Sequence, residues 1–103
     1  MFIVTFVTAS SKKEARHIAR ELIKHKLAAC VNIIEEIESI FWWQSKVDKA
    51  KETLLIIKTK KSKLNSLIKK VKALHSYEVP EIIALPIVAG NKEYLEWINE
   101  SIS

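Results

Sequence analysis

The chain contains very few of the residues that usually interrupt secondary structure. It has one glycine and two prolines among 103 residues, whereas average usage would give roughly seven and five. Loops that cradle phosphates bring several backbone N–H groups against the ligand and are therefore rich in glycine. Gly90 alone cannot form such a loop. P-loop, dinucleotide-binding and nucleophile-elbow enzymes are therefore excluded.

Cysteine and long apolar segments are also scarce. The single Cys30 cannot form a disulfide within the chain, which favours a reducing, cytoplasmic location. The longest uncharged segments, residues 1–11 and 82–91, are much shorter than the roughly 20 residues that span a bilayer. No positive residue precedes the apolar run 2–7. We therefore expect neither a signal peptide nor a membrane partner.

The formal net charge is +5, and the basic residues concentrate in the middle of the chain. Residues 46–72 carry +8, whereas residues 78–103 carry −4. Nucleic-acid binding is one interpretation of the lysine-rich segment. Arginine, which is better suited than lysine to reading bases and phosphates, occurs only twice. We therefore favour a solvated helix face with patches for self-association and expect no nucleic-acid partner.

Apolar periodicity predicts a single α+β domain over residues 1–103. Alternating β-branched and aromatic residues over 2–7 are typical of a central strand. Ser11 can cap a helix that ends near Lys26, because apolar residues then recur at helical spacing. Residues 28–43 predict a long, bent strand, the polar segment 44–51 a turn, and residues 53–59 a second strand. The last two strands would form a hairpin.

The remaining residues complete the predicted fold. Residues 64–74 carry a second helical stripe, with His75 in the last turn. Residues 79–88 predict a peripheral strand, because its two prolines cannot donate to a sheet ladder, and residues 94–102 predict a terminal helix. The order βαββαβ plus a helix is that of a ferredoxin-like plait, which leaves one sheet face open. Apolar residues on that face predict self-association; the candidates are Ile33, Ile37 and Ile56, with Trp42 and Trp43.

Few residues can carry chemistry. Cys30 lies in an apolar run that is typical of a buried thiol. The segment from His75 to Glu81 compresses an imidazole, a phenol and two carboxylates between a helix and a strand. No local ligand spacing for a closed zinc site is present, although a thiolate and an imidazole together would favour copper(I) or zinc. A catalytic Cys–His pair would need an orienting group and an oxyanion hole that the sequence does not reveal.

Several segments resemble the landmark segments of the CutA divalent-cation tolerance family, in the same order. They are residues 27–32 (LAACVN), 41–43 (FWW), 57–59 (IKT), 75–81 (HSYEVPE) and 93–97 (EYLEW). The resemblance implies a ferredoxin-like subunit in a tight homotrimer, similar in assembly to PII signalling proteins. It also implies tolerance of copper and other divalent metals, and no enzymatic activity.

The resemblance carries two metal ligands over to this chain, Cys30 and His75, and Glu81 is their acidic neighbour. Family members credited with copper binding also have a cysteine at the end of the first strand and a second histidine. Val7 and Leu74 stand at those places. We therefore predict that copper or another divalent cation binds weakly through Cys30, His75 and Glu81.

An alternative function is a PII-like signalling module that binds a small anionic ligand or partner in clefts between subunits. Its candidate lining combines one cation with aromatic walls: Trp42, Trp43, Lys58 and Tyr77. The predicted trimer interface consists of Ile33, Ile37, Trp42, Trp43 and Ile56. Because glycine, cysteine and methionine are each present once and 28% of residues are charged, the composition also favours a thermostable protein.

Overall fold

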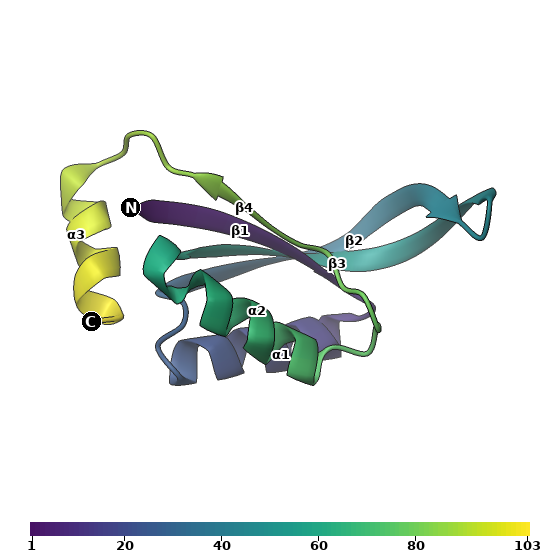
Figure 1. Ribbon diagram of the computed structural model, residues 1–103, viewed down its shortest axis with the longest axis horizontal. Coiled ribbons are helices and arrows are strands. Elements are labelled where there is room, and N and C mark those ends of the chain that lie inside the picture. The colour runs from purple at the N-terminus through teal and green to yellow at the C-terminus, as the bar shows by residue number, and fades with distance from the viewer.

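One antiparallel sheet of four strands organises the molecule. The computed structural model, which covers residues 1–103, places the strands in the order β2-β3-β1-β4 (Figure 1). Their bounds are Phe2–Ala9 for β1, Cys30–Trp43 for β2, Lys46–Lys60 for β3 and Ile82–Pro86 for β4. Every neighbouring pair is antiparallel. The predicted order of strands and helices along the chain is confirmed, and β4 lies at an edge of the sheet, which suits Pro86 at its end. Pro80 precedes the strand.

Three α-helices accompany the sheet: α1 spans Lys12–Lys24, α2 spans Leu64–Leu74 after a short 3₁₀ turn, and α3 spans Lys92–Ser101. Helices α1 and α2 lie together on one face, while α3 packs at the end where both termini lie (Figure 1). Ser11 caps α1 as predicted, because its hydroxyl accepts a hydrogen bond from the Glu14 N–H. Helix α1 ends before Lys26, whose φ of 55° is left-handed. No helix is both long and apolar enough to cross a membrane.

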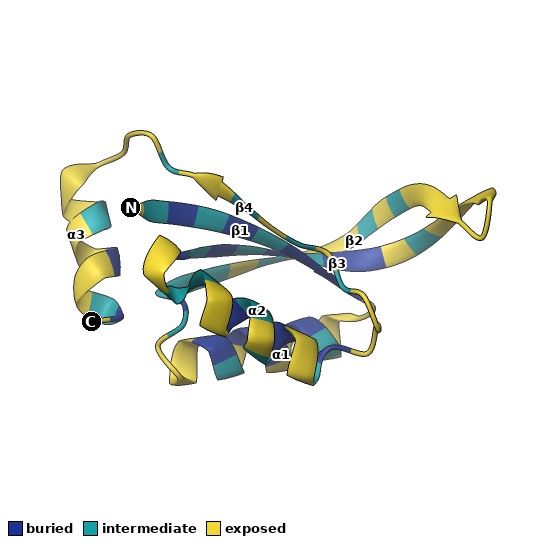
Figure 2. Cartoon of the chain, in the orientation of Figure 1, coloured by how far each residue is buried: buried dark blue, intermediate teal, exposed yellow.

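The hydrophobic core lies between the sheet and the helices α1 and α2 (Figure 2). Side chains alternate along a strand, so the odd-numbered residues of β1 and β3 face these helices. Leu55 and Ile57 of β3 meet Ile18 and Leu22 of α1, and all four are fully buried. The opposite sheet face has no helix pair over its centre and remains partly exposed. Its apolar residues are Val4, Phe6, Ile34, Leu54, Ile56, Ile83 and Leu85.

A β-bulge in β2 corrects one predicted interface residue. Ile33 pairs with Leu55 and packs against the helix-side core, so it does not lie on the open face. Ile34 takes that place and is 45% exposed. One extra residue then enters β2 before Ile37, with Glu36 at a φ of 54°. This insertion turns Ile37 to the open face, because a shift of one residue exchanges the two faces of a strand.

The predicted turn over residues 44–51 is also corrected, because β3 already begins at Lys46. Only Gln44 and Ser45 turn, both with left-handed φ values of 49° and 64°, which are typical of a type I′ hairpin. The hairpin therefore projects beyond the helices as a long arm (Figure 1) and contributes to a longest molecular dimension of 44 Å. Trp42 and Trp43, at the end of this arm, point to its opposite faces.

Candidate functional site

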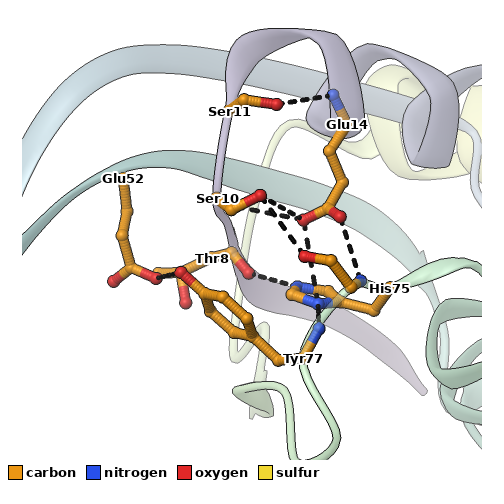
Figure 3. Close-up of polar contacts among 8 residues, drawn as sticks. Thr8, Ser10, Ser11, Glu14, Glu52, His75 and Tyr77 are labelled. Carbon is orange, nitrogen blue, oxygen red and sulfur yellow. Dashed lines mark hydrogen bonds and ion pairs between the residues drawn. The ribbon is translucent and has the colours of Figure 1, made fainter.

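His75 lies at the centre of a buried hydrogen-bond network where β1, α1 and the segment after α2 meet (Figure 3). Its side chain is fully buried. Its Nδ1 atom accepts a hydrogen bond from the Tyr77 N–H at 3.0 Å, and Nε2 lies 2.7 Å from the Thr8 carbonyl oxygen. Nδ1 therefore carries no proton, whereas the Nε2–H group donates a hydrogen bond to the Thr8 carbonyl oxygen. Both ring nitrogens are occupied, and no lone pair is free for a metal ion.

The position of His75 differs from the prediction that it lies in the last turn of α2. It is the first residue after the helix and has an extended backbone, with φ −80° and ψ 143°. This geometry turns the ring into the protein rather than along the helix axis. His75 therefore joins segments that are distant in the sequence, because its ring bonds to β1 and to the backbone after α2.

Glu14 connects the start of α1 to the same network. Its carboxylate accepts hydrogen bonds from the N–H and hydroxyl of Ser10 and from the Ser76 N–H. Glu14 thus reaches back to the N–H of Ser10, whereas in a capping box it would reach back to the N–H of the capping residue Ser11. Burial alone would raise the pKa of Glu14, but the hydrogen bonds from Ser76 and Ser10 lower it below its ordinary value of 4.5.

Tyr77 links this network to β3. Its hydroxyl donates a hydrogen bond of 2.9 Å to the Glu52 carboxylate, and its ring is tilted against His75 with the ring centres 4.8 Å apart. The pKa of Tyr77 is raised to about 12. Burial is the largest cause, and the hydrogen bond to Glu52 and the charges of Glu52 and Glu14 add to it. Tyr77 is therefore a neutral hydrogen-bond donor near neutral pH. It holds the Glu52 carboxylate in place at the base of a pocket.

That pocket, hereafter the acidic pocket, lies between the arm of β2 and β3 and the segment from Tyr77 to Glu81. Its volume is about 840 Å³. Four carboxylates line it: Asp48 and Glu52 from β3, and Glu78 and Glu81 from the segment before β4. No lysine, arginine or histidine lines it. The pocket therefore attracts cations and repels anions.

Aromatic side chains form much of the remaining wall. Trp43 and Tyr77, two of the four residues predicted to line a ligand cleft, lie in the wall of the acidic pocket together with Phe41. The other two predicted lining residues are elsewhere. Trp42 lies on the opposite face of the arm and is 76% exposed, while Lys58 pairs with Val4 and Cys30 near the other end of the sheet. The cleft therefore lacks the lysine on which an anionic ligand would depend.

The structure separates the predicted metal ligands. Cys30 pairs with Lys58 on β3, whereas Thr8, the partner of His75, pairs with Leu54. Four strand residues separate these positions, or about 13 Å along β3, which far exceeds metal–ligand distances of about 2.0–2.3 Å. Glu81 lies in the acidic pocket at the His75 end. One chain therefore does not bring Cys30 together with His75 and Glu81.

Cys30 has a different neighbour, the phenol of Tyr94 on α3. The pKa of Tyr94 is raised, chiefly by burial and to a smaller extent by the charge of Cys30 and a hydrogen bond with Cys30. No group of three or more His, Cys, Asp or Glu side chains converges closely enough to hold a metal ion. The carboxylates of the acidic pocket offer oxygen donors to a hard divalent cation. They do not enclose it as a set of direct ligands.

Sequence reasoning missed most of the acidic residues of this site. Asp48 lay in a predicted turn and Glu52 at the margin of a predicted strand, so neither had an assigned face. Only the register of the hairpin places them beside Phe41 and Ile37. A signal was nonetheless present, because Asp48, Ala50 and Glu52 alternate with lysines, and such alternation along a strand sends the two charge types to opposite faces.

Comparison with known proteins identifies close relatives over nearly the whole chain. The family model described as CutA1 divalent ion tolerance protein matches residues 3–101. The chain is 48% identical to the divalent-cation tolerance protein CutA of Thermus thermophilus over 98 residues, which are 95% of each protein. It is 52% identical to the chloroplastic protein CutA 1 of Oryza sativa over 99 residues, which are 96% of this chain and 56% of the rice protein. The chain thus spans about half the length of the plant relatives.

Solved structures agree with these sequence relationships. The structure of the periplasmic divalent cation tolerance protein CutA from Archaeoglobus fulgidus has a TM-score of 0.97 at 46% identity, with 100% of both chains covered. The Thermus thermophilus structure has a TM-score of 0.98 at 47% identity, again with 100% of both chains covered. The predicted α+β fold is therefore confirmed by its relatives as well as by its strand order.

The relatives also correct the prediction of a cytoplasmic location. The Archaeoglobus protein is described as periplasmic and the rice and Arabidopsis thaliana proteins as chloroplastic. The cytoplasmic prediction rested on the single Cys30, and it is wrong for these relatives. A chain with one cysteine cannot close an internal disulfide in an oxidising or a reducing compartment, so its cysteine count carries no information about location.

Proposed function

Because this chain belongs to the CutA1 divalent ion tolerance family, we propose that it is a trimeric, non-enzymatic protein that binds divalent metal ions. One observation carries the metal-binding proposal. The acidic pocket has four carboxylates and no basic side chain in its wall, although the whole molecule has a net charge of +5. Oxygen donors of this kind suit hard divalent cations. The relatives are named as tolerance proteins rather than as enzymes.

The mode of metal binding follows from the spacing of the donors. Because no three candidate ligands converge, a divalent ion in the acidic pocket keeps part of its water shell and bridges to Glu78 or Glu81 through water. Binding of this kind is weak and selects charge rather than one metal. Copper has a separate candidate in Cys30, which carries the only thiol of the chain.

Calorimetric titration with manganese(II), zinc(II) and copper(II) tests the metal proposal. Glu81→Gln should weaken manganese binding several-fold, because it removes one anionic oxygen donor. Glu96→Gln, an exposed carboxylate on α3, is the matched control and should bind like the wild type. Cys30→Ala should weaken the binding of copper and zinc and leave manganese binding unchanged, because a thiolate is a soft ligand. If Glu81→Gln and the wild type give equal heats on titration with manganese, the acidic pocket is not the metal site.

Trimer formation is supported by the open sheet face. Ile83 and Leu85 are 53% and 50% exposed there, beside Phe6 and Ile56, and an apolar face of this kind favours burial between subunits. Of the predicted interface residues, Ile37 and Ile56 face this side and Trp43 continues it along the arm. Light scattering should give three times the chain mass of 11.8 kDa.

Paired substitutions test which face forms the trimer. Ile83→Asp places a charge on the open face and should dissociate the assembly. Val47→Asp provides the control, because Val47 is exposed and pairs with Trp42 on the opposite face of the arm. A monomeric wild type, or dissociation by Val47→Asp alone, would contradict the proposed interface.

A further inference from the structure

The base of the acidic pocket holds a negative charge that nothing in the chain neutralises. Glu52 is only 8% exposed, and its one side-chain hydrogen bond is accepted from Tyr77. No lysine, arginine or histidine forms an ion pair with Glu52 or with any other carboxylate of the pocket. Burying a carboxylate without a counter-charge is costly. A cation that enters this pocket therefore recovers free energy that the protein alone does not.

The spacing of the carboxylates disfavours a single small ion as the best occupant. Asp48 and Glu52 lie on the same face of β3, four residues or about 13 Å apart along the strand. One ion cannot touch both groups at ordinary ligand distances. A linear molecule with positive charges separated by a flexible chain can reach each of them.

The walls between these charges suit the hydrocarbon part of such a molecule. Phe41 lies directly across from Asp48 on the neighbouring strand, Trp43 lies near the arm's turn, and Tyr77 contacts Glu52. Aromatic faces attract ammonium groups and also pack against methylene chains. The volume of about 840 Å³ falls in the range of about 300–1,000 Å³ typical of small-molecule sites.

We propose that the acidic pocket binds a linear alkylammonium cation, with its ammonium groups at Glu52 and Asp48 and its methylene chain against the aromatic wall. This inference shares with the proposed function the premise that the pocket is a cation site. A free polyamine provides this chemistry, whereas a lysine side chain of a second copy of this chain carries one ammonium group and would reach only one of the two carboxylates. The tests below separate them.

Calorimetry with spermidine tests the free ligand, and 1,4-butanediol serves as the uncharged control. Glu52→Gln should weaken spermidine binding at least tenfold, because it removes the buried charge while retaining an acceptor for the Tyr77 hydroxyl. Trp43→Leu should weaken binding several-fold at unchanged charge, whereas Glu96→Gln should match the wild type. If the wild type and the three variants bind spermidine with equal affinity, the binding is general charge attraction and the proposal is wrong.

Carbodiimide cross-linking with peptide mass spectrometry tests the lysine alternative. A cross-link between Glu52 or Asp48 and a lysine of another copy, absent in the corresponding Gln or Asn variant, identifies that lysine as the occupant. If spermidine does not bind, or if such a cross-link forms and spermidine does not displace it, the inference is wrong. Manganese titration of the same samples separates this inference from the proposed function. Loss of the aromatic ring in Trp43→Leu should weaken spermidine binding and leave the binding of a hydrated metal ion unchanged.

Discussion

Replacement of His75 by alanine tests whether the network around this ring is structural. The substitution removes the acceptor of the Tyr77 N–H and the donor to the Thr8 carbonyl, and it leaves a cavity where a fully buried ring stood. Buried groups left without partners cost about 1–3 kcal/mol each, so we expect a loss of about 2–4 kcal/mol in unfolding free energy. For a domain of this length, the melting temperature should fall by roughly 10–30 °C.

His75→Gln refines the test, because a glutamine amide can still donate to the Thr8 carbonyl while the Tyr77 N–H loses its acceptor. Its loss of stability should lie between those of the wild type and His75→Ala. Urea unfolding at one fixed protein concentration measures the series, because assembly would make the midpoint depend on concentration. A destabilisation below about 1 kcal/mol for His75→Ala, or loss of manganese binding with unchanged stability, would refute the structural role.

Two further predictions concern the pH dependence and the hairpin. The pKa of Glu14 is lower in the folded protein than its ordinary value of 4.5, so its charge stabilises the fold above pH 4.5, and this contribution is lost as the pH falls through the folded-state pKa. The stability difference between wild type and Glu14→Gln should therefore shrink below pH 4.5 in urea titrations, and a difference that grows there would contradict it. Ser45→Gly should raise the free energy of unfolding by about 0.5–1 kcal/mol in the same urea titrations, because glycine adopts the left-handed φ of 64° without the steric cost of a side chain. Ser39→Gly, which lies inside β2, is the control and should lower the free energy of unfolding.

Periodicity predicted the fold because most of its elements are amphipathic along their whole length. Ile18 and Leu22 repeat on one face of α1, and both are buried. The hairpin was harder to predict, because its type I′ turn contains Gln44 and Ser45 in place of the usual asparagine and glycine. The bulge near Glu36 was equally hidden, and it decides which isoleucines of β2 face the helices.

The site was less predictable than the fold because its residues come from distant segments. Glu14, Glu52 and Tyr77 meet through strand register and side-chain hydrogen bonds, neither of which local spacing reveals. His75 was correctly singled out from its neighbours, but its role depends on the direction of its ring. Only the structure shows that both ring nitrogens point into the protein and are occupied.

The sign of the charge in the acidic pocket separates the two functions that the sequence left open. A PII-like module for an anionic ligand needs a cation in its cleft, and Lys58 lies near the opposite end of the sheet. The lysines of the chain concentrate instead around α2, where residues 61–72 contain five and no acidic residue. Four carboxylates remain together in the pocket, with Glu52 held by Tyr77. Because an anion would meet these charges at close range and in a partly desolvated site, its binding is disfavoured even though the molecule as a whole is basic.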